Sequence, residues 1–490
     1  MSEPQASDQP GAAVPGAATP GSATPGSATP GAATPGAAEP GRSPTPAARA
    51  EAESLDDFVL TLGRSQLAAG YAVDDVTTTL NAVARAYDRP DLSVAVLPGI
   101  VLIDDPLIGR ARVTSEGALA TLRLDQAAKV HEVASEARRG AIAPYEGTRI
   151  LDALPNKEPR FPPWASVLGY ALASAGFALI FRVSAWGVAI AALLGLFVGL
   201  LLVLTRRRPN FLPLVPPLAA VVCSFSVFGF ASLIDAQVQP LRVVVAPLIA
   251  LVPGAALTRA TQELASGHVI SGASRLVAAI VQILVLTFGI LIGTLLSRIS
   301  PYDISDVTLE QLPLWVAWLG ACVYAAGQAL AFNVPHGAIR YVVLLLLIAF
   351  SVQQVVTWQL DPVLAAGVAA AVSLFLALLI QDRVRNGPPA FVLFTPVFWL
   401  LVPGSLGLVG ITEAITSAGA PSGTPASTVS GAAGVPSITD IAETGNVGLL
   451  ITAGASIIAI TIGMQIASIA GRMIRRLPDL PSVRLPGARH

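Results

Sequence analysis

The hydrophobic positions of this chain change their pattern twice along its length. Residues 1–50 are a low-complexity tract rich in Pro, Gly, Ala and Thr, with too little apolar surface for a core, so we expect a disordered tail. Residues 54–155 show the amphipathic spacing of a small soluble domain. From residue 164 almost to the C-terminus, long apolar segments follow one another, which predicts an α-helical polytopic membrane protein.

The amphipathic region predicts a small α/β domain. Apolar positions recur at helical spacing on both sides of Gly70, which predicts two helices. Two short β-rich runs, 92–97 and 100–103, flank a Pro-Gly pair and predict a hairpin. A third helix is expected over about 124–139.

The membrane region contains ten apolar segments, each close to the ~20 residues that a spanning helix needs. The expected spans are 164–182, 185–204, 212–234, 241–259, 274–298, 314–333, 338–358, 361–380, 389–411 and 446–471. A C-terminal tail, 473–490, follows the last span.

Two of these segments carry the same break. Leu-Val-Pro-Gly at 251–254 is followed nine residues after its glycine by Glu263, and Leu-Val-Pro-Gly at 401–404 is followed at the same interval by Glu413. Pro and Gly interrupt a membrane helix, and a carboxylate is costly in the bilayer. Breaks in corresponding places of two halves point to a transporter's binding site. We therefore place the two pairs in the substrate pathway, with simple helix kinks as the alternative: Pro253, Gly254, Pro403 and Gly404.

The membrane region also reads as a duplication. Residues 164–181 align with 315–332, with eight identities in 18 positions that include two glycines in each segment. This repetition predicts two five-helix repeats, 164–298 and 314–472. Because five is an odd number, the second repeat must enter the membrane from the opposite side, as an inverted repeat.

The charges give an orientation. With the soluble domain in the cytoplasm, the inner loops and C-terminal end carry eleven arginines: Arg206, Arg207, Arg208, Arg259, Arg275, Arg340, Arg383, Arg385, Arg472, Arg475 and Arg476. The outer loops carry three: Arg182, Arg242 and Arg298. The positive-inside rule therefore predicts that the N- and C-termini are cytoplasmic. Of 30 basic residues only Lys129 and Lys157 are lysines. This bias indicates a GC-rich bacterial genome and hence the bacterial cytoplasmic (inner) membrane.

Overall composition narrows the partners. The chain is 53% hydrophobic and 12% charged, with a net charge of −1, which favours the lipid bilayer over nucleic acid as a partner. No nucleotide-binding loop or metal-ligand spacing appears, so we expect neither a cofactor nor an enzyme. A homo-oligomer is compatible with the sequence. His131 and Glu132 on the third expected helix would suit acid–base chemistry, but a solvated helix face explains them better.

The inverted arrangement assigns candidate roles to polar membrane residues. It places Glu263 near the inner mouth and Glu413 near the outer mouth, where they could couple or gate transport by exchanging protons; interfacial carboxylates are the alternative. Gln328 and Asn333 are candidate pathway residues or partners in helix–helix hydrogen bonds. Arg275 is a possible contact for a substrate carboxylate, although an arginine there also snorkels readily.

Several runs resemble the threonine/serine exporter (ThrE) family. They are Leu67-Ala68-Ala69-Gly70 through Ala86-Tyr87, Ile270-Ser271-Gly272-Ala273 and the Pro403-Gly404 span, and the resemblance covers about residues 55–476. It implies a cytoplasmic domain followed by ten spans, and export of L-threonine and L-serine driven by the proton motive force. Relatives encoded by split genes are linked to dicarboxylate export. One departure is that Ser93–Leu97 lacks the family's His-x-Asp-x-Thr pattern on the first strand.

Together these patterns predict a secondary active transporter that exports small amino acids with protons as the coupling ion. An exporter of small dicarboxylates and an uncoupled channel for small solutes are the alternatives.

Overall fold

The computed structural model describes residues 45–115, 122–206, 208–234, 240–297, 312–384, 388–401 and 447–475. All helices and strands of these ranges belong to the unit of the chain that begins at Pro46. The second Pro-Gly pair, Pro403-Gly404, and Glu413 lie outside the described residues.

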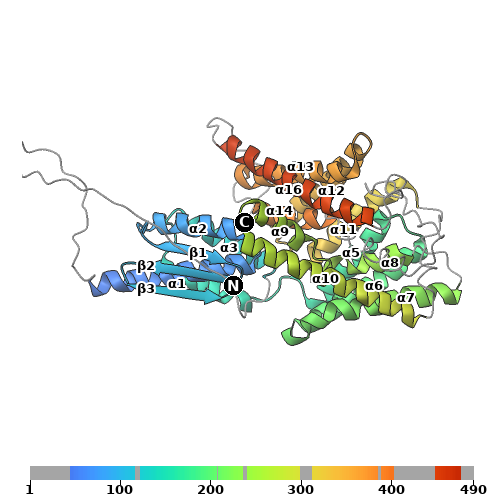
Figure 1. Cartoon of the computed structure of the whole chain (residues 1–490), viewed down its shortest axis with the longest axis horizontal. Coiled ribbons are helices and arrows are strands. Elements are labelled where there is room, and N and C mark those ends of the chain that lie inside the picture. The colour runs from blue at the N-terminus through green and yellow to red at the C-terminus, as the bar shows by residue number, and fades with distance from the viewer. Residues whose placement is uncertain are drawn as a thin grey trace, which may run out of the picture. The chain divides into compact units, whose positions relative to one another are not determined.

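Residues 46–156, here called the N-terminal domain, combine helices with one antiparallel sheet (Figure 1). Its elements are α1 (Pro46–Ala68), α2 (Val73–Ala86), β1 (Ser93–Leu97), β2 (Ile100–Asp105), β3 (Arg110–Ser115), α3 (Leu124–Ala137), α4 (Pro144–Ala153) and η1 (Leu154–Asn156). β1 and β2 form the expected hairpin, and Leu97 pairs with Ile100 across the turn.

Two elements of the N-terminal domain escaped the sequence analysis. β3 reads Arg-Ala-Arg-Val-Thr-Ser, has no buried residue and offers almost no apolar alternation. α4 is a short helix that buries only Gly147 and Leu151. The domain has a hydrophobic core of its own, which includes the fully buried Phe58, Leu62 and Leu80.

The membrane region follows from Pro163. Its helices are α5 (Pro163–Ile180), α6 (Ala185–Thr205), η2 (Pro209–Leu214), α7 (Val215–Ile234), α8 (Pro240–Leu248), η3 (Ile249–Leu251), α9 (Gly254–Ala265), α10 (Val269–Leu296), α11 (Leu314–Ala331), α12 (His336–Thr357), α13 (Pro362–Arg383), α14 (Ala390–Leu401) and α16 (Val447–Arg475).

Within the described residues, eight helices are long and apolar enough to cross a membrane, and the bent pair 240–251 and 254–265 raises this to nine if it is one span. α14 is a shorter apolar helix that ends where the described range ends. The chain is therefore a multi-pass membrane protein. The ten spans expected from the sequence remain a prediction.

Glycines let the first helices of the two expected repeats pack backbone to backbone. A Cβ added to Gly169 of α5 would lie 2.9 Å from the carbonyl oxygen of Gly327 in α11, and one added to Gly176 would lie 2.8 Å from that of Gly320. The order of these contacts makes α5 and α11 antiparallel. Because the sequence aligns 169 with 320 and 176 with 327, exchanging the two repeats converts the first contact into the second.

A second pair of contacts is related in the same way. In α10, a Cβ on Gly289 would meet the carbonyl of Pro217 in α7, at 2.9 Å. In α16, a Cβ on Gly463 would meet the carbonyl of Gly367 in α13. The sequence pairs Gly289 with Gly463, and Pro217 precedes Gly367 by the interval that separates the two Pro-Gly breaks.

The close approach of α5 and α11 predicts that Gly176→Ala destabilises the membrane region by about 1–3 kcal/mol, because the added methyl group must separate two backbones. Reversible unfolding of the purified protein in mixed detergent micelles would measure this change. Gly229→Ala is the matched control, since a Cβ there would meet nothing within 4 Å. Equal stability of the two variants would contradict the packing described here.

Candidate functional site

The first Pro-Gly pair breaks its helix as expected. α8 and η3 meet α9 at an angle of 59°, and Pro253 caps the N-terminus of α9. The carbonyl of Leu251 accepts a 2.6 Å hydrogen bond from Nε2 of Gln282 in α10. The carbonyl of Leu251, at the break, therefore already has a hydrogen-bond partner within the protein. The break instead redirects α9 towards the N-terminal domain, where the Glu263 side chain meets the backbone N–H of Val73 at the start of α2.

Glu263 lies at the junction that this bend creates. Its side chain is 2% exposed, and its Oε2 forms an ion pair with Nε of Arg275 at 3.2 Å and accepts a 2.5 Å hydrogen bond from Ser271 Oγ. Its Oε1 accepts a 3.3 Å hydrogen bond from the backbone N–H of Val73, the first residue of α2. A carboxylate at a helix N-terminus also interacts favourably with the helix dipole. Glu263 thus joins α9, α10 and the N-terminal domain.

A second contact at the same junction involves His268 and Asp74. His268 Nε2 lies 4.0 Å from Asp74 Oδ1, which adds an ion pair when the imidazole is protonated. His268 lies in the short turn between α9 and α10, and Asp74 is in the first turn of α2.

A cavity of about 370 Å³ opens beside this junction, between the N-terminal domain and helices α9, α13, α14 and α16. The wall formed by the N-terminal domain includes Gln66, Tyr71, Asp75 and His131. The wall formed by α9 includes Thr258, Arg259 and Gln262, and aromatic and aliphatic side chains of α13 and α14 complete it, among them Leu374, Phe391 and Phe394. A cleft of this size with a few converging polar groups has the character of a small-molecule site.

Charge is distributed unevenly around the cavity. Arg259 brings a guanidinium group from the membrane side, and Asp75 brings a carboxylate from the N-terminal domain. Enclosure by surrounding protein, and then the Asp74 carboxylate, raise the pKa of Asp75 above its ordinary value, while Arg472 opposes this shift. Gly70 makes room for Arg259: it adopts φ +87°, and a Cβ there would lie 2.7 Å from a guanidinium nitrogen.

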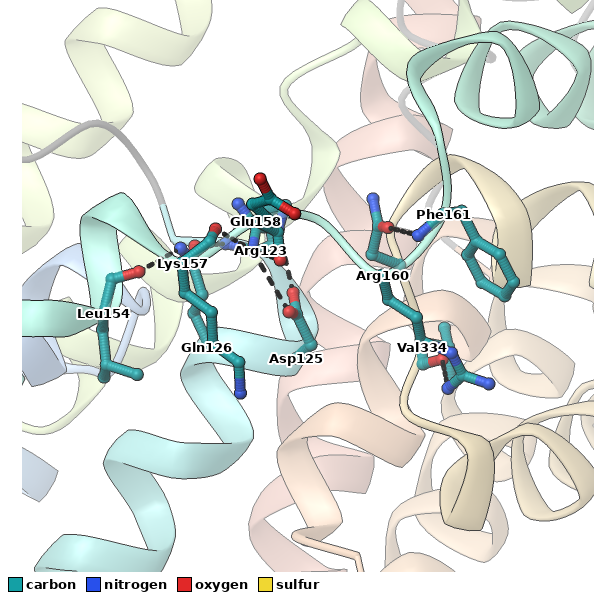
Figure 2. Close-up of polar contacts among 10 residues, drawn as sticks. Arg123, Asp125, Gln126, Leu154, Lys157, Glu158, Arg160, Phe161 and Val334 are labelled. Atoms are coloured by element: carbon teal, nitrogen blue, oxygen red, sulfur yellow. Dashed lines mark hydrogen bonds and ion pairs between the residues drawn. The ribbon is translucent and has the colours of Figure 1, made fainter. Parts of the chain in front are cut away.

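Residues 157–162 connect the N-terminal domain to the first membrane helix, and hydrogen bonds hold this connection at both of its ends (Figure 2). Arg123 of the N-terminal domain donates to the backbone carbonyl of Lys157 at 3.0 Å. At the membrane end, Phe161 N donates to Asn333 Oδ1 at 3.0 Å, and Arg160 donates to the carbonyl of Val334 at 2.9 Å. Asn333 follows the end of α11, is fully buried and adopts φ +53°. Its side-chain oxygen binds the connection, through the backbone N–H of Phe161.

The remaining candidate residues do not gather at one site. Arg275 is the ion-pair partner of Glu263, and Gln328 is buried in α11, where its Nε2 bonds Tyr324 Oη. None of Pro253, Gly254, Gln328 and Asn333 lines the cavity. Their assignment to the substrate pathway remains a prediction.

Two cavity residues, His131 and Arg259, were assigned other roles from the sequence. His131 was expected on a solvated face, but it is half-buried, its Nδ1 lies 3.0 Å from the Tyr71 hydroxyl, and its ring faces Phe391 of α14. Arg259 was counted only as an inner-loop charge. The available signal was a charged residue five positions after the glycine of the first Pro-Gly break, followed one turn later by Glu263.

The spanning helices, the bent helix and a cavity at their junction with the N-terminal domain are features of a multi-pass membrane protein. Residues 57–297 match the sequence model of the family described as "Putative threonine/serine exporter". This match confirms, over that part of the chain, the resemblance found in the sequence.

Fungal proteins, some of them named as membrane proteins, are among the curated relatives. Pheromone-regulated membrane protein 10 of Saccharomyces cerevisiae is 26% identical over 243 residues, which are 49% of this chain and 31% of that protein. Its namesake in Kluyveromyces lactis is 28% identical over 205 residues, covering 41% of this chain and 22% of the relative. An uncharacterized protein of Schizosaccharomyces pombe is 24% identical over 265 residues, which are 51% of this chain and 31% of that protein. The match to the first of these relatives thus spans about a third of its length. No solved structure matches this chain significantly.

The Glu263 junction predicts a non-additive effect on stability. Arg275→Gln should cost about 2–4 kcal/mol, because it leaves a buried carboxylate without its cation. Adding Glu263→Gln to that variant should recover part of the loss, since the unpaired charge is then removed as well. A double-mutant cycle on the unfolding of the full chain measures both effects, and additive losses would show that the two side chains do not interact.

Proposed function

We propose that this chain exports small amino acids, L-threonine and L-serine foremost, from the cytoplasm at the expense of the proton motive force. The observation that carries the proposal is the broken helix: α9 continues from the Pro253-Gly254 bend directly into the wall of the cavity. Discontinuous membrane helices recur at the binding sites of secondary transporters. The description of the matching family supports the same activity and substrates.

The proposed architecture is a pair of inverted five-helix repeats with ten spans in all. Two glycine-mediated contacts support it, because each recurs at the aligned positions of the other repeat. One is the contact between α5 and α11, which run antiparallel, and the other is the contact of α10 with α7, which recurs between α16 and α13. The second Pro-Gly pair, at Pro403-Gly404, would then form the outer counterpart of the bend at Pro253-Gly254. Rocking of one repeat against the other alternates access to a central site.

The proposed orientation places the N-terminal domain in the cytoplasm. The arginine distribution supports this orientation through the positive-inside rule, and the arginine-rich composition supports a bacterial cytoplasmic membrane. In this orientation the cavity lies at the inner mouth of the pathway, since it is lined by the C-terminal parts of α13 and α16 and by α14 from its first residue.

Glu263 provides a route from proton binding to movement. Protonation removes the negative charge that holds Arg275 and the N-terminus of α2, so the N-terminal domain separates from α9 and α10 and the inner mouth opens. Loss of the proton to the cytoplasm restores these contacts. Glu413, at the same interval after the second Pro-Gly pair, is the proposed counterpart at the outer mouth.

The function is tested by efflux from proteoliposomes loaded with radiolabelled solute, with and without an imposed proton gradient. The panel contains L-threonine, L-serine, L-alanine, succinate and malate. Export of threonine or serine against its gradient that stops with a protonophore supports the proposal. Faster export of a dicarboxylate supports the alternative substrate class, and downhill flux that ignores the proton gradient indicates a channel.

Replacing Pro253-Gly254 by Ala-Ala should restore a continuous helix and turn α9 away from the cavity wall. Efflux of threonine should fall at least tenfold while the amount of folded protein in the membrane stays near normal. Gly229→Ala serves as a helix-glycine control, because that position has room for a methyl group. Unchanged efflux in the Ala-Ala variant would mean that the bend is only a packing feature.

Glu263→Gln keeps the shape of the side chain but removes its charge and its proton chemistry. Accumulation against a gradient should be lost, while exchange of labelled for unlabelled threonine at equal concentrations continues. Uphill and exchange flux measured in the same vesicles give the two rates. If the variant still drives uphill export with an unchanged pH dependence, Glu263 is not the coupling group.

A further inference from the structure

Four polar groups on the cavity wall lack a protein partner among the described residues. Thr258 is fully buried and its Oγ1 has no hydrogen bond, and Gln66 is 1% exposed with its Oε1 equally unsatisfied. Arg259 and Asp75, on opposite walls, have neither a hydrogen bond nor an ion pair to another side chain that the structure describes. Of the four, Thr258 and Gln66 are buried, Arg259 is partly buried and Asp75 is exposed. Unsatisfied buried groups such as those of Thr258 and Gln66 are rare in native proteins and call for a ligand or water.

Other polar groups of the same wall are satisfied within the protein. Gln381 Oε1 accepts from the backbone N–H of Ala390, and the hydroxyls of Thr395 and Ser468 donate to carbonyls in their own helices. The unsatisfied groups are therefore concentrated on α9 and on the facing part of the N-terminal domain.

The α9 wall is a donor surface suited to a carboxylate. Arg259 forms no salt bridge within the part of the chain that the structure describes, because the neighbouring carboxylate, Glu263, is already held by Arg275, Ser271 and the N-terminus of α2. Thr258 stands next to Arg259 and adds a hydroxyl donor. Guanidinium groups bind carboxylates with two parallel hydrogen bonds, and an enclosed site strengthens such bonds.

The facing wall carries the exposed guanidinium of Arg138 together with two acceptors that suit an ammonium group. Gln66 Oε1 can only accept, and Asp75 carries a carboxylate open to the cavity. The carboxylates of Asp74 and, more weakly, Glu263 disfavour a further negative charge at Asp75, and Arg472 partly offsets their effect. A second carboxylate on a ligand would meet this repulsion, whereas a cation would relieve it.

We propose that this cavity binds a small zwitterionic α-amino acid, with its carboxylate on Arg259 and Thr258 and its ammonium group towards Gln66 and Asp75. The inference rests on the proposed function, for which the cavity is the loading site at the inner mouth. It adds the recognition chemistry and selects amino acids over dicarboxylates.

The test is calorimetric binding to the full-length protein in lipid nanodiscs. The probes are L-threonine, L-threonine methyl ester, which lacks the carboxylate charge, N-acetyl-L-threonine, which lacks the ammonium charge, and succinate. Wild-type protein should bind threonine, and each of the other three about tenfold or more weakly. Succinate binding as tightly as threonine, or ester and threonine binding equally, would overturn the assignment without any variant.

Variants locate the two charges. Arg259→Gln should bind threonine about tenfold more weakly and no longer discriminate against the methyl ester. Asp75→Asn should lose discrimination against the N-acetyl derivative instead. Arg139→Gln is the matched control, because Arg139 is exposed and follows the cavity-lining Arg138 without lining the cavity itself. If both cavity variants retain wild-type discrimination, the binding site lies elsewhere.

Transport in the same preparations separates this inference from the proposed function. Wild-type protein that exports threonine while Arg259→Gln keeps full ester discrimination refutes the site but leaves the exporter intact. Threonine that binds with the predicted discrimination but is never exported supports the site and refutes the exporter.

Discussion

The arrangement of this protein depends on the burial of one carboxylate. Glu263 is 2% exposed, and a charge in such a place must be compensated by nearby cations and hydrogen-bond donors. The donors come from three elements: Arg275 and Ser271 on α10, and the backbone N–H of Val73 at the start of α2. Satisfying one side chain therefore fixes where the N-terminal domain meets the membrane helices.

The same constraint determines the chemistry of the cavity. Arg259 precedes Glu263 by one turn of α9 and would be its natural partner, but Arg275 occupies that role. Arg259 instead points its charge at the cavity, against the surface of Gly70. The ion pair of Glu263 with Arg275 thus leaves Arg259 without a salt bridge among the described residues, on the cavity wall where a ligand can reach it.

The sequence anticipated the features that local chemistry determines. The bend at Pro253 follows from a missing backbone donor and the freedom of Gly254, and the structure confirms it. The family resemblance is confirmed over residues 57–297. The hairpin at 92–103 follows from β-rich runs around a Pro-Gly turn, whereas β3 was missed because its side chains are largely exposed. The inverted repeats and the role of Glu413 remain predictions.

The cavity was beyond the reach of the sequence, because it is formed by residues that lie far apart along the chain. Gln66 and Thr258 are separated by almost two hundred residues, and nothing in either local pattern indicates that they share a wall. His131 likewise occupies an ordinary position on an amphipathic helix, and only the packing of α3 against α14 encloses it. Long-range packing, not local propensity, decides such sites.

The central claim is that the N-terminal domain covers the inner mouth and separates from α9 and α10 during transport. Asp74 and His268 meet across that boundary, with side-chain atoms 4.0 Å apart. Cysteines at these two positions, in a chain without Cys223 and Cys322, can be bridged by a short cleavable dithiol-reactive linker while threonine efflux is recorded. The account predicts that bridging stops efflux, that cleaving the linker restores it, and that neither single-cysteine protein responds. Undiminished efflux from fully bridged protein would contradict it.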